Sequence, residues 1–285
     1  MNLIIIFCLC IIATSKVTVQ GFFSKKHIKT VADAILFNGL IFLFSSLIFL
    51  KYAFPINAPV FLFGAVFGFL TVLFQLSYIK AMSCGNVSIT VMLVNFSMII
   101  PITVSVLFYD EKVTVLRFLG ILLTALAFIL STGAKKEDLC SEKWLLLSLT
   151  ASFLNGALLV CQKIFGKSAW ATENVSFVAY GYLTATVISV LFSVFIHKKG
   201  AGITFKIKPT VFIYALSLGL ILGLFQVINT KAIANIESAL LFPTYNGGSL
   251  IFSSISGVLI LHDRLNKKQL FSIIVGTVAI IMMNI

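Results

Sequence analysis

The sequence predicts an all-α membrane protein with ten transmembrane helices arranged as two inverted five-helix repeats. First, 60% of its 285 residues are hydrophobic and only 11% are charged, and the mean hydropathy of +1.10 is far above that of soluble domains. Second, ten apolar segments are long enough to cross a bilayer, which takes roughly 20 residues in a helix. Third, residues of the first half recur in the second half at a fixed spacing. The chain is therefore expected to be solvated mainly by lipid.

The ten predicted spans follow one another along the chain. They cover residues 2–21, 30–50, 57–79, 86–109, 115–133, 144–163, 174–196, 209–230, 236–261 and 268–284. The first of them could also be read as a secretory signal, but it has no Lys or Arg in its N-terminal region and no evident small-residue cleavage site. It is taken as the first helix.

Six residues of the first half return 151 positions later. They are Gly68, Phe74, Gln75, Lys80, Ala81 and Asn95, which recur as Gly219, Phe225, Gln226, Lys231, Ala232 and Asn246. The most polar interval, residues 133–143, separates two halves of five spans each, 1–133 and 144–285. Because five is odd, the second half must enter the membrane from the opposite side. Such halves can open a site between them alternately to either side, so the pattern favours a transporter.

Shorter matches extend the repeat to other parts of the chain. Gln20 and Phe23 match Gln162 and Phe165 at a spacing of 142. The turn Glu111–Thr114 matches Asp263–Asn266 at a spacing of 152, and each turn reads acid, base, aliphatic, polar.

The five-plus-five layout, the Lys-Ala pairs at 80–81 and 231–232 that open short hairpins, and the two acidic turns resemble the drug/metabolite transporter superfamily, in its ten-helix EamA-type branch. The resemblance covers nearly the whole chain. It implies a solute carrier with a central cavity between the halves, moving small metabolites or drugs, often outward. Pro101 and Pro243 depart from the usual spacing of the family, so no pore geometry is carried over.

Lys16 is a cation inside the first predicted helix. An ammonium group in lipid costs several kcal/mol, about 3 on insertion scales, unless it reaches the interface or faces a wet cavity. Two readings are open: the side chain snorkels toward Lys25 and Lys26, or it lines a cavity and attracts a carboxylate or phosphate. The matching position of the second half is Leu158, so the charge is asymmetric.

Amide side chains form a second set of candidates. They are Gln20, Gln75, Asn95, Asn155, Gln162, Gln226 and Asn246. Because an unsatisfied amide is costly in hydrocarbon, each should point into the bundle, either as interhelical glue or into a cavity. Gln75 and Gln226 are expected to be glue, whereas Asn95 and Asn246 are expected to line the cavity. Pro243, Gly247 and Gly248 predict a partly unwound helix beside Asn246 that exposes carbonyl groups.

Aromatic and acidic residues complete the candidates. Tyr180 and Tyr182 flank Gly181, so one of them can line the cavity while interfacial anchoring is the alternative. Tyr245 is placed in the cavity with Asn246. Glu111 and Asp263 are expected to cap the helices that follow them, and Glu237 is either a gate or a cap. The predicted substrate-binding set is Lys16, Asn95, Asn155, Tyr180, Tyr245 and Asn246.

The distribution of charged residues limits the class of solute that the protein is expected to carry. All nine Asp and Glu residues fall at the ends of the predicted spans or in loops, while the first helix carries a base. Anionic or zwitterionic metabolites are therefore favoured over cationic drugs. A flippase of lipid-linked or phosphorylated lipids is the alternative, since branches of the superfamily it resembles move such substrates. A structural or assembly role is less favoured, because polar pairs are held at membrane depth.

No cofactor, metal or nucleic acid is expected. His27, His197 and His262 lie in separate loops without metal-ligand spacing, and no nucleophile with a base indicates an enzyme. The net charge of +12 comes from short basic clusters, which suit anionic lipid headgroups. The protein is expected to be a multi-pass protein of the cell membrane, and a homodimer stays open. The resemblance places both termini in the cytoplasm, whereas the loops after odd-numbered helices hold 14 Lys and Arg against six on the other side, which favours termini outside.

Overall fold

The computed structural model describes residues 2–27, 31–84, 90, 93–132, 142–198, 209–261 and 267–284, and in these ranges it contains ten α-helices and no strand. The helices are α1 (Asn2–His27), α2 (Val31–Ile48), α3 (Ala58–Cys84), α5 (Ile99–Phe108), α6 (Val115–Thr132), α7 (Glu142–Gly166), α8 (Asn174–Lys198), α9 (Pro209–Asn235), α10 (Ser238–Leu261) and α11 (Lys267–Asn284). Short 3-10 turns lie at η1 (Leu50–Ala53), η2 (Phe96–Met98) and η4 (Ala171–Glu173). Each of the ten predicted segments overlaps one of these α-helices, and several helices, such as α1 and α3, extend beyond the predicted ends.

Four helices of the described ranges are long and apolar enough to cross a membrane by length and composition. They cover Ala58–Ala81, Glu142–Gly166, Ala171–Phe195 and Pro209–Asn235. Shorter apolar helical stretches of 10–17 residues lie at Ile4–Lys16, Ala32–Ile48, Leu93–Phe108, Val115–Leu130 and Leu270–Met283. Large apolar side chains lie on the outside of the bundle, among them Phe108 and Leu146. This suits a lipid environment, because lipid tails are as apolar as these side chains.

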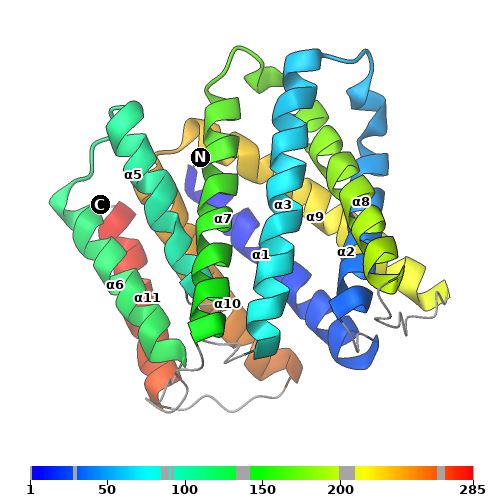
Figure 1. Cartoon of the computed structure of the whole chain (residues 1–285). Coiled ribbons are helices and arrows are strands. Elements are labelled where there is room, and N and C mark those ends of the chain that lie inside the picture. The colour runs from blue at the N-terminus through cyan, green and yellow to red at the C-terminus, as the bar shows by residue number, and fades with distance from the viewer. Residues whose placement is uncertain are drawn as a thin grey trace.

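Successive helices run in alternating directions through the bundle (Figure 1). Both chain ends lie at one end of the bundle, together with the connections α2–α3, α5–α6, α7–α8 and α9–α10. We call this end the terminal face. The other end, the opposite face, holds the C-terminal ends of α1, α3, α6, α8 and α10. α1 and its counterpart α7 run in opposite directions through the bundle.

Helix packing follows a two-repeat architecture in which contacts between the halves come in equivalent pairs. α3 packs against α8, and its counterpart α9 packs against α2. α3 also packs against α7, and correspondingly α9 packs against α1. α6 and α11, the last helices of the two halves, pack against each other. The halves are therefore interleaved, and the largest buried apolar cluster contains side chains of both.

Glycines allow the closest of these contacts. A Cβ atom added at Gly68 on α3 would lie 2.2 Å from the carbonyl oxygen of Gly181 on α8. A Cβ atom at Gly219 on α9 would lie 2.9 Å from the carbonyl oxygen of Ile41 on α2. The two glycines are partners in the 151-residue repeat, so small residues serve the same packing role in each half.

Gly68→Ala is expected to lower the stability of the protein, because the added methyl group overlaps backbone atoms that cannot rotate away. Overpacking of this kind typically costs about 1–3 kcal/mol. Gly276→Ala is the matched control, since its Cβ atom would lie 3.7 Å from Ala127, an ordinary contact. The midpoint of thermal unfolding in detergent should fall for Gly68→Ala and stay near wild type for Gly276→Ala. Equal midpoints would contradict the close contact.

The prediction of an unwound helix around Pro243 was wrong. α10 is α-helical from Ser238 to Leu261 and contains Pro243. Pro243 lies only five residues after Ser238, so one backbone bond is lost near the helix start while later turns continue. Gly248 instead gives room to α1, because a Cβ atom there would lie 2.7 Å from the Sγ atom of Cys10.

Candidate functional site

Lys16 lies near the middle of α1 on the side that faces the bundle. The exposed stripe of the helix contains Ile4, Phe7 and Ile11, whereas Lys16 follows the fully buried Leu9 by seven residues and so shares its face. Its side chain is half-buried, and within the described residues it has no hydrogen-bond or ion-pair partner. This placement favours the interior reading of Lys16 over a position on the lipid side.

A set of side-chain contacts joins four segments around Cys10 of α1, six residues before Lys16. The Sγ atom of Cys10 lies 3.5 Å from the carbonyl oxygen of Tyr245 on α10. The amide of Asn246 contacts the sulfur of Met98 at 3.4 Å, and Asn155 on α7 donates to Ser97 at 2.7 Å. The structure thus brings α1, η2, α7 and α10 together, which come from both halves.

The predicted site residues divide into two groups by their partners. Asn95 and the hydroxyl of Tyr245 are half-buried and have no hydrogen-bond partner among the described residues, and Asn246 makes only the weak contact to sulfur. With Lys16, these groups keep free capacity for a solute. The side-chain amide of Asn155 is already engaged in its hydrogen bond to Ser97.

Tyr180 and Tyr182 are both buried within the large apolar cluster. The hydroxyl of Tyr180 donates to the carbonyl oxygen of Ala53 at 2.5 Å, which holds the α2–α3 connection on α8. The hydroxyl of Tyr182 lies 3.4 Å from Gln226, and its ring stacks on Phe42. We therefore leave Tyr180 out of the site proposed below.

Gln162, one of the seven candidate amides, is the centre of a buried polar network whose other members include two residues that the sequence did not single out. Its side-chain oxygen accepts hydrogen bonds from Gln226 at 2.6 Å, Asn229 at 3.1 Å and Thr230 at 3.2 Å. These contacts join α7 to α9, so Gln226 is interhelical glue as predicted. The matched amides Gln162 and Gln226 could be recognised from the sequence repeat. Asn229 and Thr230 could not, because neither has a matching residue in the first half. Gln75 lines a cavity of about 10 Å³ between α2, α3 and α8, and the side chain of Gln20 lies outside the described part.

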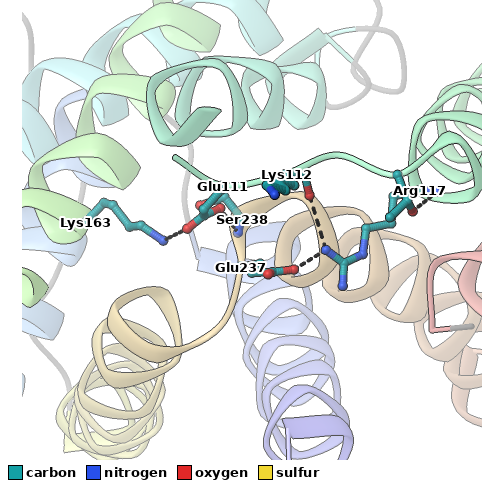
Figure 2. Close-up of polar contacts among 7 residues, drawn as sticks. Glu111, Lys112, Arg117, Lys163, Glu237 and Ser238 are labelled. Atoms are coloured by element: carbon teal, nitrogen blue, oxygen red, sulfur yellow. Dashed lines mark hydrogen bonds and ion pairs between the residues drawn. The ribbon is translucent and has the colours of Figure 1, made fainter. Parts of the chain in front are cut away.

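A second polar network lies at the terminal face, where Glu111 is placed between Lys163 and Ser238 (Figure 2). The carboxylate of Glu111 pairs with the ammonium group of Lys163 and accepts the backbone N–H of Ser238 at 2.6 Å. The Lys163 side chain is 1% exposed and that of Glu111 10%, so this ion pair is buried. Lys163 was not singled out in the sequence, because its position at the end of an apolar span gave no sign of a partner.

Glu111 caps a different helix from the one expected. We predicted that it caps the helix that follows it, but the N-terminus of α6 is capped by Thr114, whose hydroxyl accepts the N–H of Arg117 at 3.3 Å. Glu111 instead binds the first N–H of α10, in the other half of the chain. Asp263, its counterpart, lies outside the described residues. Arg117 pairs with the carboxylate of Glu237, which connects the start of α6 to the α9–α10 hairpin (Figure 2).

The described residues contain no group of three or more His, Cys, Asp or Glu side chains that could hold a metal ion. Around the predicted solute site, the described residues offer the ammonium group of Lys16, amides and a phenol. Such groups bind carboxylate, phosphate and other hydrogen-bonding groups of a solute by charge and hydrogen bonds.

Apolar helices in two interleaved repeats, with a lysine and amide side chains on internal faces, are typical of a membrane transport protein. The family model of the EamA-like transporter family matches residues 3–133 and again residues 142–285. The chain therefore belongs to the EamA-like transporter family, whose members are transporters of small molecules and not enzymes.

One solved structure, a crystal structure of a protein, shares the fold with a TM-score of 0.77 at 12% sequence identity. The similarity covers 99% of this chain and 96% of that chain. No curated protein matches the sequence. The crystal structure thus supports the fold of the whole chain.

Proposed function

We propose that this protein carries small anionic or zwitterionic metabolites across the cell membrane by alternating access, as an exporter or exchanger. The observation that carries the proposal is Lys16, a cation on the internal face of α1 that has no partner among the described residues. A buried ammonium group is costly, so a solute carboxylate or phosphate that neutralises it gains a strong, charge-assisted interaction.

The solute site would lie between the two repeats. We assign residues 1–133 and 144–285 to five-helix repeats that cross the membrane in opposite senses, ten times in all. The opposite directions of α1 and α7 and the paired contacts between the halves support this assignment. Rocking of one repeat against the other would then open the site to each side in turn.

Three further residues would bind the polar groups of the solute. Asn95, Tyr245 and Asn246 keep free hydrogen-bonding capacity within the described part of the chain. Asn155 stands behind Asn95 through its bond to Ser97 and would position η2. Amides and a phenol beside one cation suit a zwitterion, which needs acceptors as well as donors.

Metabolite profiling tests the proposal most directly. Cells with and without the protein should differ in their pools of small acids or amino acids, and the purified protein in liposomes should move the same compounds. A change confined to lipid-linked or phosphorylated lipids would instead support a flippase, in which the same lysine could bind a phosphate group. Movement of cationic compounds alone would contradict the role of Lys16.

We further propose that the terminal face is cytoplasmic, as in the family that the sequence resembles. Reporter fusions at the C-terminus test the orientation, since an enzyme reporter that works only in the cytoplasm should be active. An inactive reporter would agree with the distribution of Lys and Arg and would reverse the assignment.

A further inference from the structure

The ion pair between Glu111 and Lys163 joins the two repeats at the terminal face. Glu111 belongs to the α5–α6 connection of the first half, whereas Lys163 lies near the end of α7 and Ser238 starts α10, both in the second half. Removing one partner of a buried ion pair leaves an uncompensated charge. The contact therefore holds the two halves together more firmly than an exposed pair could.

The backbone turns sharply just before Glu111. Asp110 has a φ of 53°, in the left-handed region, which ends α5 and directs the next residue toward the second half. The hydroxyls of Ser105 and Ser238 lie 2.7 Å apart beneath this turn, and the ring of Tyr109 lies 5.9 Å from the Lys163 ammonium. Lys163 is thus enclosed by an anion and an aromatic ring.

The sequence repeat has no equivalent of this network for the opposite face. Glu111 corresponds to Asp263, so an acid is present in both turns. The other three members have uncharged counterparts. Lys163 corresponds to Gly21 at the spacing of 142, Glu237 to Asn86 at 151, and Arg117 to Gln269 at 152. None of these three carries a charge, so the ion pairs of the terminal face cannot be formed in the same way on the other side.

We propose that Glu111 and Lys163, supported by Arg117 and Glu237, form an ionic latch that holds the terminal face closed, and that the substrate-free carrier therefore rests with this face shut. The proposal rests on the alternating-access mechanism above. A two-state equilibrium shifts only by the difference in interaction between the two states, and an ion pair present in one state alone provides that difference. A solute bound in the interior must then supply enough energy to open the latch.

Accessibility of a buried site behind the latch tests the proposal. Met98 is 1% exposed and precedes Ser105 by seven residues on the same helical run, about 10 Å deeper. In a full-length chain with its five native cysteines changed to Ala, Met98→Cys is labelled with a membrane-impermeant maleimide applied from the terminal face of vesicles without solute. Glu111→Gln is expected to raise the labelling rate about tenfold or more.

Three further variants keep the test decisive. Glu173→Gln is the matched control, because Glu173 is a carboxylate of the same face that bonds Asn57 outside the latch. It should leave the rate unchanged. Glu237→Gln removes one partner of the more exposed ion pair and should raise the labelling rate by a smaller factor than Glu111→Gln. It tests the latch on its own if Glu111→Gln folds poorly. The double exchange Glu111→Lys with Lys163→Glu should return the rate toward wild type.

The latch is overturned if neither Glu111→Gln nor Glu237→Gln raises labelling, or if Glu173→Gln raises it equally. Lys16→Met separates this outcome from the proposed solute site. It should leave labelling from the terminal face unchanged, because Lys16 makes no contact with the latch. A fast-labelling Glu111→Gln variant would thus support the latch even if Lys16→Met transported normally.

Discussion

Lys16→Met is expected to reduce transport of anionic and zwitterionic solutes to background. The substitution keeps the length and apolar stem of the side chain but removes the only cation of α1 described on its internal face. A hydrogen bond to a charged group is worth about 1.5–3 kcal/mol, and more where water is excluded, so binding should fall by one to two orders of magnitude or more. The measurement is uptake of a radiolabelled acid or amino acid, identified by profiling, into liposomes.

The stability of this variant distinguishes binding from structure. On insertion scales a lysine at the centre of a membrane helix costs about 3 kcal/mol, so the methionine variant should unfold at an equal or higher temperature. Lys231→Met is the control, since Lys231 is exposed at the end of α9. Normal transport by Lys16→Met, or loss of expression in step with activity, would mean that Lys16 is a structural residue and that the proposed site is wrong.

Gln162→Leu is expected to cause the largest loss of stability. The change removes one oxygen that accepts three hydrogen bonds, from Gln226, Asn229 and Thr230, all buried between helices. A buried donor left unsatisfied costs about 1–3 kcal/mol. Interhelical bonds in membranes average about 0.6 kcal/mol, so a loss of about 2–4 kcal/mol in the free energy of unfolding is expected for the three together. Unfolding in mixed detergent micelles measures it.

Two variants control for side-chain shape. Gln162→Met keeps the length of the side chain without its oxygen and should lose about as much stability as Gln162→Leu. Thr230→Val removes a single donor and should cost under half as much. If Gln162→Leu is as stable as Thr230→Val, the network contributes little and α7 and α9 are held by their apolar contacts.

Much of the fold could be predicted because a lipid environment restricts which backbone conformations can cross the membrane. A backbone in hydrocarbon must satisfy its hydrogen bonds within each segment, so apolar length alone placed a helix in each predicted span. The repeat could be recognised because glycines at close helix contacts cannot be exchanged for larger side chains without overlap. Gly68 and Gly219 accordingly lie at equivalent helix contacts.

The polar site was harder to predict because a local pattern does not identify a distant partner. Glu111 was expected to cap its own helix, yet it binds Ser238, 127 residues away. Lys163 stood beside Gln162 without any local sign that a carboxylate would reach it. Pro243 suggested a break, but its position near the start of α10 limited the disruption to one bond. For Glu111 and Lys163 the deciding contact came from the other half of the chain.

The interleaved packing also constrains how the chain can fold during synthesis. α2 and α3 touch each other only slightly, while α2 lies against α8 and α9, and α3 lies against α7 and α8. The nascent first half can therefore insert its helices, but the glycine faces of α2 and α3 cannot be buried until translation has passed α8, which ends at Lys198. Until then, Gly64 and Gly68 face lipid or an insertion chaperone instead of α8. A ribosome stalled before α7 would leave the five helices of the first half inserted while α2 lacks both α8 and α9, and such a fragment is a natural target for membrane quality control.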